Sequence, residues 1–475
     1  MNKVANIDRV WEIFAELNQI ARPSHHEEKV ADYLCQFAQQ HKLAYERDAH
    51  NCVVMRKAAT AGHENVEPLV LLNHMDMVCV GEPTKPYNAL TDAIETEICD
   101  GWMHAKGTSL GADNGVGLSI ALALIADDSL EHGPLEVLTT TNEEDGMTGA
   151  ANLGGDFIKG RKVINLDSED YDTITVGAAG AYMQKATWHY APTPLEDGKQ
   201  LVKITIEGGN GGHSGVDIHK GRCNAIKLLG ELLYRLPTND LQIGDLNGGE
   251  SRASIATKAT ATLAVSNADK ASQLINKIGN TLLADYKGSD NGMCIATTAA
   301  TTATLLGKAD SKAIIETLHN LPFGVLKMRE DLPGTVQTSN NIGLLWQTGN
   351  TIELTTHTRS FSDTEMESLG KEIARNVQAN GGEMTLEANS PAWQENSQSA
   401  FIEKVSNAFV NELGIAPKKV AMHFVLEAGY FVRKYPGIEI ACIGPRIVSP
   451  HSTSERVEMN TVEDILKVAK SLVCC

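Results

Sequence analysis

Short apolar runs alternate with helix-like segments over the first 180 residues of the chain. Apolar residues near the N-terminus recur at helical spacing: Ile7, Val10, Phe14 and Leu17. Ser24 and Glu27 form a capping-box pattern, which predicts that a helix opens there and runs over 25–41. Apolar runs predict buried strands at 68–72, 135–139 and 163–166, and the segment 114–126 is helical in pattern. This alternation favours a doubly wound, mostly parallel α/β sheet.

The pattern changes after about residue 182. Strand-like segments that are richer in Thr and Ala lie at 201–206, 259–265, 301–305 and 351–356. Amphipathic helices are predicted near 222–236, 268–285, 309–319 and 363–379. Strands of mixed polarity suit a sheet with one covered face, so this stretch predicts a small α+β domain. The α/β pattern returns after about 390, with a buried strand at 438–443 and a last helix capped by Thr461.

Charge and composition exclude several kinds of partner. The formal net charge of the 475 residues is −19, and so acidic a surface repels nucleic acid and anionic lipid. The N-terminus lacks a signal-like apolar stretch, and no apolar run approaches the roughly 18 residues of a membrane span. We therefore expect a cytoplasmic protein. The nine cysteines are scattered and never form a CxxC pair, which argues against a disulfide framework, and Cys474 with Cys475 is interpreted as a frayed tail.

Acidic residues and histidines follow the predicted strands at four places. They are His74 and Asp76 after 68–72, Asp113 in a glycine-rich turn, Glu143 and Glu144 after 135–139, and Asp167 after 163–166. Each motif alone has an ordinary explanation, such as a capping pair, turn chemistry or a solvated charge run. Ligands of open α/β sheets gather beyond the carboxyl ends of the strands, where unpaired carboxylates are costly. The joint placement therefore predicts one shared site.

Two divalent metal ions would give these acids a partner. Histidine and carboxylate ligands suit zinc, with manganese or cobalt as substitutes. In this hypothesis Asp113 bridges two ions, and the other ligands are His74, Glu144, Asp167 and one later histidine. Three carboxylates and a bridging hydroxide then neutralise the four positive charges, which makes burial tolerable. Asp76 would orient the ring of His74, and Glu143 stays unligated as a candidate general base.

Long motifs in the chain resemble those of a known peptidase family. They are RPSHHEEKVADYL, NHMDMV, GTSLGADNGVGLSIALALIAD, HGPLEVLTTTNEEDGMTGA, INLDSE, GGHSGVDIH and IGPRIVSPHS. Together they span nearly the whole chain and are similar to motifs of the zinc exopeptidases that include aminoacyl-histidine dipeptidases, carnosinases and aminoacylases. The resemblance implies that His74, Asp113 and Asp167 hold one zinc ion. Asp113, Glu144 and His451 would hold the second.

The resemblance also implies a domain plan. Because His451 lies far beyond the central segment, residues 182–390 would form an inserted lid domain with a ferredoxin-like α+β fold. The catalytic domain would consist of residues 1–181 and 391–475. Family members pair through the lid, so we expect a homodimer.

Three lid residues match positions that contact substrate in the family. His213 would stabilise the tetrahedral oxyanion, and Arg359 with Asn341 would hold the substrate carboxylate, for which an arginine fork is suited. Without the resemblance, His213 is interpreted as a turn histidine in a glycine-rich loop and Arg359 as part of a surface ion pair. Phe424 and Val425 replace smaller residues of the family pattern near the expected substrate, which bears on side-chain preference.

These features predict a metallopeptidase that hydrolyses small dipeptides. Xaa-His dipeptides, including β-alanyl-histidine, are implied as substrates by the resemblance alone. The metals would acidify a bound water, and Glu143 would take its proton and pass it to the leaving amine. The alternatives are an N-acyl amino acid deacylase or tripeptidase on the same scaffold, a non-catalytic binding module, and a nucleophilic hydrolase. A GxSxG elbow, which would favour the last of these, is absent around Ser214.

Overall fold

The computed structural model describes residues 5–237, 241–301, 303–330, 332–394 and 399–474, which form two compact units. Unit 1 comprises Met1–Gly177, Gln394–Ala421 and Glu427–Cys475, and unit 2 comprises Ala178–Trp393 with Met422–Leu426. The chain thus leaves unit 1 after 177 and returns at 394, close to the predicted boundaries at 182 and 390. The short excursion of residues 422–426 into unit 2 has no signal in the sequence pattern.

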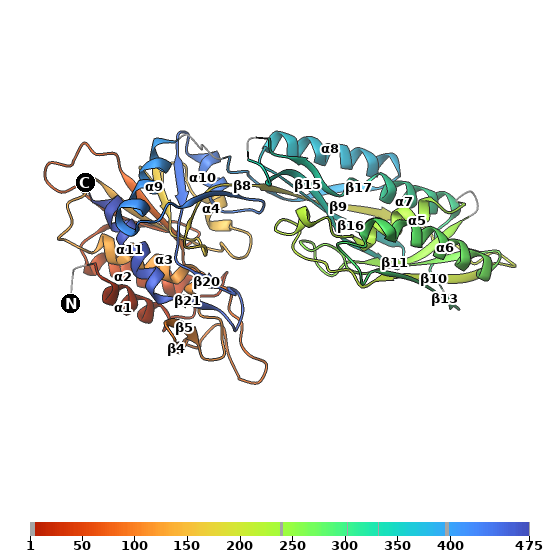
Figure 1. Cartoon of the computed structure of the whole chain (residues 1–475), viewed down its shortest axis with the longest axis horizontal. Coiled ribbons are helices and arrows are strands. Elements are labelled where there is room, and N and C mark those ends of the chain that lie inside the picture. Colours follow the sequence, from red (N-terminus) through yellow and green to blue (C-terminus); the bar gives the residue numbers. More distant parts are fainter. Residues whose placement is uncertain (1–4, 238–240, 302, 331, 395–398, 475) are drawn as a thin grey trace. The chain divides into compact units, whose positions relative to one another are not determined.

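The centre of unit 1 is an eight-stranded sheet (Figure 1). In spatial order its strands are β1 (Ala44–Arg47), β2 (Val53–Lys57), β6 (Leu135–Thr140), β3 (Leu69–His74), β7 (Lys162–Asn165), β19 (Glu439–Cys442), β8 (Thr173–Ala178) and β18 (Lys418–Met422). Strands β6, β3, β7 and β19 run parallel, and β2 and β8 join this block antiparallel. The strand order reverses around β3, because β6 and β7 follow it in the chain and flank it on opposite sides. Such a switch point leaves a crevice at the carboxyl ends of the strands.

Helices cover this sheet and complete the α/β class that the pattern predicts. They are α1 (Ile7–Leu17), α2 (Glu28–Gln40), α3 (Ala112–Ile125), α4 (Thr148–Asn152), α9 (Ala400–Leu413), α10 (Ala428–Lys434) and α11 (Met459–Val473). Helix α3 is apolar all round and buried from end to end, since it packs against β3 and β6 and also against α1 and α11. A small second sheet joins β20 (Ile447–Val448), β21 (Arg456–Glu458), β5 (Trp102–Ala105) and β4 (Thr96–Cys99).

Two predicted helix caps are wrong. Ser24 lies outside α2, and its hydroxyl donates a hydrogen bond to Asp76 Oδ2 at 2.8 Å. Thr461 lies inside the first turn of α11, and its Oγ1 accepts a hydrogen bond from the backbone N–H of Arg446 at 2.9 Å. In both places the side chain bonds to a segment that is distant in the sequence, so a local capping pattern does not predict its partner.

Unit 2 is built on a nine-stranded sheet whose paired strands run antiparallel. In spatial order the strands are β13 (Cys294–Ala300), β10 (Gln200–Glu207), β12 (Ala259–Val265), β11 (Gln242–Gly248), β15 (Val336–Thr348), β16 (Thr351–Ser360), β9 (Gly180–His189) and β17 (Glu383–Ser390), with β14 (Gly324–Met328) paired to β15. Its helices are α5 (Ala225–Tyr234), α6 (Ala268–Leu283), α7 (Lys308–Asn320) and α8 (Asp363–Ala379), with the short 3-10 helices η1 (Ile218–Lys220) and η2 (Ala284–Tyr286).

These helices pack onto one face of the sheet, as the mixed polarity of the strands predicts (Figure 1). Alternate residues of the central strands, including Ala186, Trp188, Ile352 and Leu354, are buried beneath them. The predicted strand at 301–305 is wrong, because the strand of this region is β13 and ends at Ala300. Leu305 forms only isolated bridges, to Thr193 and Gly244, and residue 302 lies outside the described residues.

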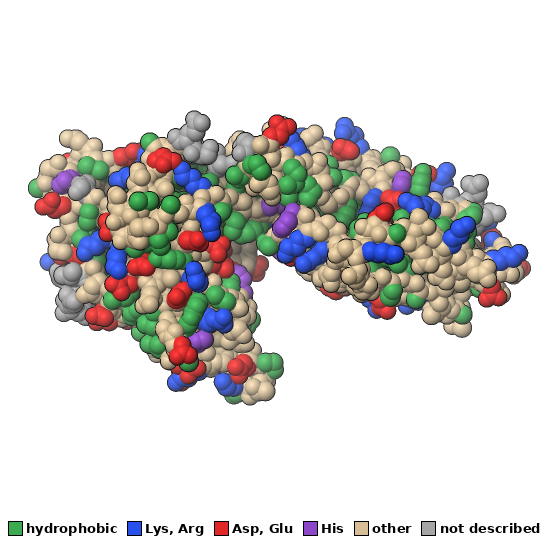
Figure 2. All heavy atoms as spheres, in the orientation of Figure 1, with side chains coloured by type: hydrophobic (Ala, Val, Ile, Leu, Met, Phe, Trp, Pro, Cys, Tyr) green, Lys and Arg blue, Asp and Glu red, His purple; other side chains and the backbone are tan. Residues whose placement is uncertain are grey.

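Within the described ranges, the structure has no helix that is both long and apolar enough to cross a bilayer. Figure 2 shows Asp and Glu side chains interspersed with Lys and Arg over the visible surface of both units. The acidic excess of the chain is therefore not gathered into a single patch on this face.

Candidate active site of unit 1

The acidic residues and histidines of unit 1 meet beyond the carboxyl ends of three neighbouring strands. His74 is the last residue of β3 and pairs in register with Thr140, the last residue of β6. Glu143 and Glu144 follow β6, and Asp167 follows β7. The parallel register of β6, β3 and β7 thus places these side chains at one edge of the sheet, at the switch point around β3.

Asp113 lies between two histidines and uses a different oxygen toward each. Its Oδ1 is 3.1 Å from Nε2 of His74, which is also 3.1 Å from Oδ1 of Asp167. Its Oδ2 is 3.1 Å from Nε2 of His451, which is 2.9 Å from Oε2 of Glu144. Two triads therefore share Asp113, and these are the two ligand sets that the resemblance implies.

The carboxylates of this site shift the pKa values of their neighbours. Burial lowers the pKa of His74, but Asp167, Asp113 and Asp76 more than compensate and raise it well above its ordinary value. Hydrogen bonds to Asp113 and Glu144 raise the pKa of His451 to about 11. Burial raises the pKa of Asp167 to about 7. The carboxylates of this site outnumber its two histidines, so the site carries an excess of negative charge.

The donor set fits divalent metal ions. One ligand atom each from His74, Asp113 and Glu144 lies within 4.8 Å of the others, and the buried Oε1 of Glu144 has no hydrogen-bond partner among the described residues. Ligand atoms around a tetrahedral zinc ion with bonds of about 2.1 Å are roughly 3.4 Å apart, close to the separations in both triads. Imidazole nitrogen with carboxylate oxygen is a donor set for zinc and for neighbouring transition metals.

Asp76 holds the backbone that carries the two glutamates. Its carboxylate accepts hydrogen bonds from the backbone N–H groups of Glu143 (3.1 Å) and Glu144 (3.2 Å). Nδ1 of His74 lies 3.1 Å from the backbone oxygen of Asp76 and 3.5 Å from its Oδ1, so the backbone oxygen is the nearer partner. The orientation of the His74 ring by the Asp76 carboxylate stays a prediction, while the backbone contacts of that carboxylate are a task that the sequence did not indicate.

Glu143 is bound through its backbone, and its carboxylate forms no hydrogen bond or ion pair within the described part of the chain. Burial, together with Asp167, Glu427 and Glu144, raises the pKa of Glu143 well above its ordinary value. Sequence reasoning missed Glu427, a fully buried carboxylate of the same region. Its Oε2 accepts a hydrogen bond from Thr140 at 2.7 Å, and burial with the nearby Asp167 raises its pKa to about 8.

His213, Arg359 and Asn341 lie in unit 2. Nδ1 of His213 accepts hydrogen bonds from the backbone N–H groups of Gly215 and Val216 at 3.3 and 3.1 Å, so the ring proton of the neutral form lies on Nε2. Burial and the Arg359 guanidinium lower the pKa of His213 to about 4, which keeps the ring neutral. His213 is thus a hydrogen-bond donor at Nε2.

Arg359 on β16 is a buried cation, 4% exposed, and within the described residues it forms no ion pair. Its hydrogen-bond partner is Ser214 Oγ, 3.4 Å from Nη2, and burial lowers the pKa of Arg359 to about 10. The interpretation as a surface ion pair is therefore wrong. A buried guanidinium without a carboxylate is a ready site for an anion from outside the chain.

Asn341 uses both ends of its amide inside unit 2. Its Nδ2 donates to the backbone oxygen of Ser254 (2.8 Å), and its Oδ1 accepts from Asn224 (3.3 Å). The sequence did not single out two further histidines beside Arg359. Both ring nitrogens of the buried His357 lack a partner among the described residues, and Nε2 of His423 lies 2.8 Å from Ser339 Oγ. His357 stands two residues before Arg359 in a strand, a period-2 signal that would have found it.

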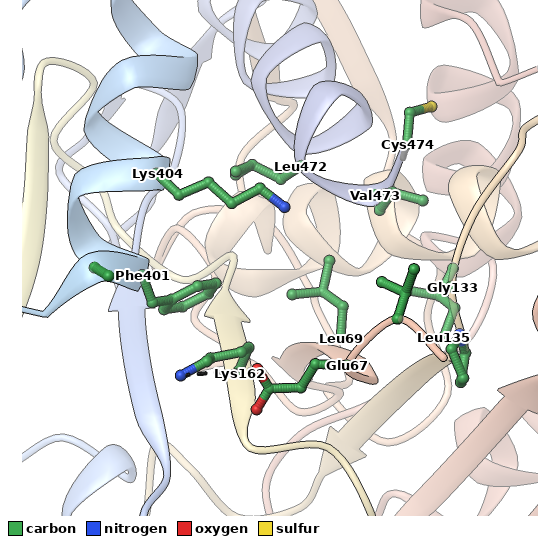
Figure 3. A pocket seen from close by; sticks show the side chains of 13 residues that line it. Glu67, Leu69, Gly133, Leu135, Lys162, Phe401, Lys404, Leu472, Val473 and Cys474 are labelled. Carbon is green, nitrogen blue, oxygen red and sulfur yellow. Dashed lines mark ion pairs between the residues drawn. The ribbon is translucent and has the colours of Figure 1, made fainter. Parts of the chain in front are cut away.

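A pocket of about 400 Å³ in unit 1 is separate from this site (Figure 3). Leu69, Leu135 and Lys162 line it, and these are the first residues of β3, β6 and β7, whereas the acidic site follows their last residues. Cys474 also lines this pocket and forms a β-bridge with His132, so the prediction of a frayed tail is wrong for Cys474. Cys475 lies outside the described residues.

The fold and the site together are those of a hydrolase whose acidic centre lies at the switch point of an α/β sheet. The sequence model of peptidase family M20/M25/M40 matches residues 70–475, and the chain belongs to this family. It is 35% identical over 465 residues to the cytosol non-specific dipeptidase of Escherichia coli K12, covering 95% of this chain and 94% of that protein.

Solved structures agree with this assignment. The crystal structure of aminoacylhistidine dipeptidase from Vibrio alginolyticus superposes with a TM-score of 0.90 at 32% identity, over 98% of this chain and 96% of that chain. The aminopeptidase PepT of Bacillus cereus shares the fold with a TM-score of 0.60 at 16% identity, over 99% of this chain and 98% of that one. The chain is a peptidase with an α/β unit and an α+β unit of this family's architecture.

Proposed function

We propose that this peptidase hydrolyses dipeptides at a centre of two divalent metal ions, zinc in the native protein, with manganese or cobalt as substitutes. The observation that carries the proposal is the pair of triads that share Asp113 through its two carboxylate oxygens. His74 and Asp167 complete one set, and His451 and Glu144 complete the other. When bound, the metals supply polarisation of the scissile carbonyl and a water of lowered pKa.

Glu143 acts as the general base in this proposal. Its backbone N–H is anchored on Asp76, while its carboxylate forms no hydrogen bond or ion pair with the other described residues. A carboxylate held in this way can take a proton from water and return it to the leaving amine nitrogen. Glu144, whose backbone N–H is held by the same Asp76, faces His451 instead, so neighbouring glutamates have different tasks.

Arg359 binds the carboxylate of the dipeptide, and His213 donates from Nε2 to the oxyanion. Support comes from the guanidinium of Arg359, which forms no ion pair within the described residues, and from the tautomer that the two backbone N–H groups impose on His213. Recognition of a free carboxylate favours dipeptides over long chains, since only a short substrate places its carboxylate next to the scissile bond. Asn341 as a further carboxylate ligand stays a prediction, because its amide is used by Ser254 and Asn224.

Side-chain preference is the finer part of the proposal. The relative in Escherichia coli is called a non-specific dipeptidase and that of Vibrio alginolyticus an aminoacylhistidine dipeptidase. We propose that Xaa-His dipeptides, including β-alanyl-histidine, are among the substrates. A cytosolic location is proposed from the name of the Escherichia coli relative.

A substrate panel tests the function. Purified protein loaded with zinc, manganese or cobalt is offered β-alanyl-histidine, several Xaa-His dipeptides, dipeptides without histidine, tripeptides and N-acetyl amino acids. We expect cleavage of dipeptides and none of the acetylated set. Cleavage of the acetylated set alone would replace the dipeptidase assignment with a deacylase. A protein that holds its metals and cleaves none of these amides would point to a binding module.

We also propose a homodimer formed through unit 2. Strand β13 ends the sheet, pairs with β10 on one side and is largely exposed, and its free edge can pair with a second copy. Light scattering of the purified chain should give twice the mass of 51.2 kDa. A proline at Thr297, near the middle of β13, should shift the protein to monomer, and an unchanged dimer would place the interface elsewhere.

A further inference from the structure

Two buried ionic residues contact the turn that carries Asp113, and the proposed chemistry uses neither of them. Glu455 is 2% exposed and follows His451 by four residues, in the loop between β20 and β21. Arg22 is 1% exposed and lies between α1 and α2. Neither residue belongs to the two triads described above. Charged side chains this deeply buried require partners, so their hydrogen bonds indicate what they do.

Glu455 bonds to four consecutive backbone N–H groups. Oε2 accepts from Leu110 (2.8 Å) and Gly111 (3.0 Å), and Oε1 accepts from Ala112 (2.8 Å) and Asp113 (3.3 Å). These residues form the turn that opens α3 and carries the shared Asp113. Glu455 thus ties the loop of His451 to the turn of Asp113, across more than 340 residues of sequence.

Arg22 holds the same turn from its carbonyl side. Its Nη2 donates to the backbone oxygen of Gly111 at 2.7 Å. Its Nη1 donates to the backbone oxygens of Met75 (3.2 Å) and Asp76 (3.4 Å), the two residues that follow His74. Arg22 therefore links the end of β3 to the turn of Asp113.

Gly111 is the point where both contacts meet. Its φ is +67°, a left-handed conformation that favours glycine. A Cβ there would lie 2.5 Å from Met77 Sδ and 2.6 Å from Nη2 of Arg22, so a side chain would push the guanidinium away. The Arg22 guanidinium can approach this turn only because residue 111 is glycine.

We infer that Arg22 and Glu455 are positioning residues that set the separation of His74, Asp113 and His451. Glu455 fixes Asp113 relative to His451, and Arg22 fixes it relative to His74. Outer partners of metal ligands are known to change metal affinity by about 10–100-fold. His74 belongs to the hydrogen-bond ladder of β3, and the residues on either side of Asp167 donate backbone hydrogen bonds to β3 and to the end of β19, whereas His451 lies on a loop. Loss of Glu455 should therefore weaken one ion more than the other.

The inference rests on the proposed metal centre, and Glu455→Gln tests it. Glutamine keeps the shape but offers one acceptor oxygen and turns an NH2 group toward two N–H donors. The matched control is Glu136→Gln. Glu136 is 3% exposed, its Oε2 accepts from the backbone N–H groups of Lys159 and Gly160, both at 2.8 Å, and it lies on β6 away from the triads.

Zinc content is measured by mass spectrometry after dialysis against a graded series of competing chelator, beside the melting temperature of the metal-free proteins. We expect Glu455→Gln to release one of its two ions at 10–100-fold lower chelator activity, and added zinc to restore its turnover. Glu136→Gln should melt earlier and keep both ions at the wild-type affinity.

Arg22→Lys is the second variant, with Arg56→Lys as its control, because lysine keeps the charge and loses the fork that reaches two segments. We expect Arg22→Lys to weaken zinc retention and Arg56→Lys to leave it unchanged. Wild-type zinc affinity in both Glu455→Gln and Arg22→Lys overturns the inference, as does an equal loss in the controls. Wild-type protein that retains fewer than two ions would instead overturn the proposed metal centre.

Discussion

Replacement of Arg359 by methionine should change stability and catalysis in opposite directions. Burial lowers the pKa of this guanidinium from its ordinary value to about 10, and the residue is 4% exposed. A shift of that size corresponds to a free-energy cost of about 3 kcal/mol for burying the charged guanidinium in the folded protein without substrate. Methionine replaces the aliphatic stem of arginine and brings no charge and no unsatisfied N–H. We expect Arg359→Met to be more stable by about 1–3 kcal/mol, with a melting temperature several degrees higher.

The catalytic effect has the opposite sign because the same guanidinium is proposed to bind the substrate carboxylate. A hydrogen bond to a charged partner contributes about 1.5–3 kcal/mol, so kcat/KM for a dipeptide should fall roughly 10–150-fold. For the corresponding dipeptide amide, which has no carboxylate, kcat/KM should change little. The control is Arg252→Met, since Arg252 is exposed and pairs with Glu387 at 2.7 Å. It should leave both substrates and the melting temperature near wild type.

The assay compares scanning calorimetry with initial rates on a dipeptide and its amide for the three proteins. Loss of stability in Arg359→Met would show that the charge has a partner in the free protein. An equal loss of rate on the acid and the amide would show that Arg359 does not recognise the carboxylate. Either result refutes the assignment of this residue.

Three further predictions concern the acid centre and the histidines. Glu143→Gln should keep its metal content by mass spectrometry and lose about 10²–10⁴-fold in turnover, and wild-type turnover would end its role as base. Chelation should abolish hydrolysis and lower the melting temperature, with zinc restoring both, and activity that survives complete removal of metal would exclude the metal centre. Burial and Arg359 lower the pKa of His423 to about 3 and that of His357 well below its ordinary value, so the unfolded chain binds more protons than the folded one below pH 6.5. The free energy of unfolding should therefore be highest above pH 6.5 and should fall below it, by up to about 1.4 kcal/mol per pH unit for each histidine. The drop in melting temperature between pH 7 and pH 5 should be smaller in His357→Leu than in the wild type. An equal drop would refute the contribution of His357.

The parallel block of unit 1 could be predicted because its signal is local. Buried parallel strands are short apolar runs, and β3, β6 and β7 lie within a residue or two of the predicted positions. Once three parallel strands are predicted, the residues that follow them must lie at one edge of the sheet. This alone predicts that His74, Glu144 and Asp167 are neighbours. His451 is different, since only the resemblance to a family distinguished it from other late histidines.

The parts that could not be predicted depend on partners that are distant in the sequence. The apolar pattern of β13 is weak because the strand lies at a sheet edge and is largely exposed, so the prediction fell on 301–305 instead. Ser24 and Thr461 look like caps, but Asp76 and Arg446 use their side chains. A capping pattern states only that a hydroxyl can accept locally, and tertiary contacts decide whether it does.

Side chains that bind backbone N–H groups leave the weakest trace of all. A proposed metal ligand such as Asp113 must be an acid or a histidine next to other such residues, which restricts both its type and its place. Glu455 and Asp76 bond to amides that every residue except proline carries, so nothing in the bonded segment 110–113 or 143–144 reveals them. Asp76 could be placed at the site only because it follows a predicted strand, and Glu455 has no comparable sign, since its burial is known only from the fold. Prediction from sequence therefore finds the groups proposed to bind metal sooner than the groups that hold them in place, although both sets fix the same few distances.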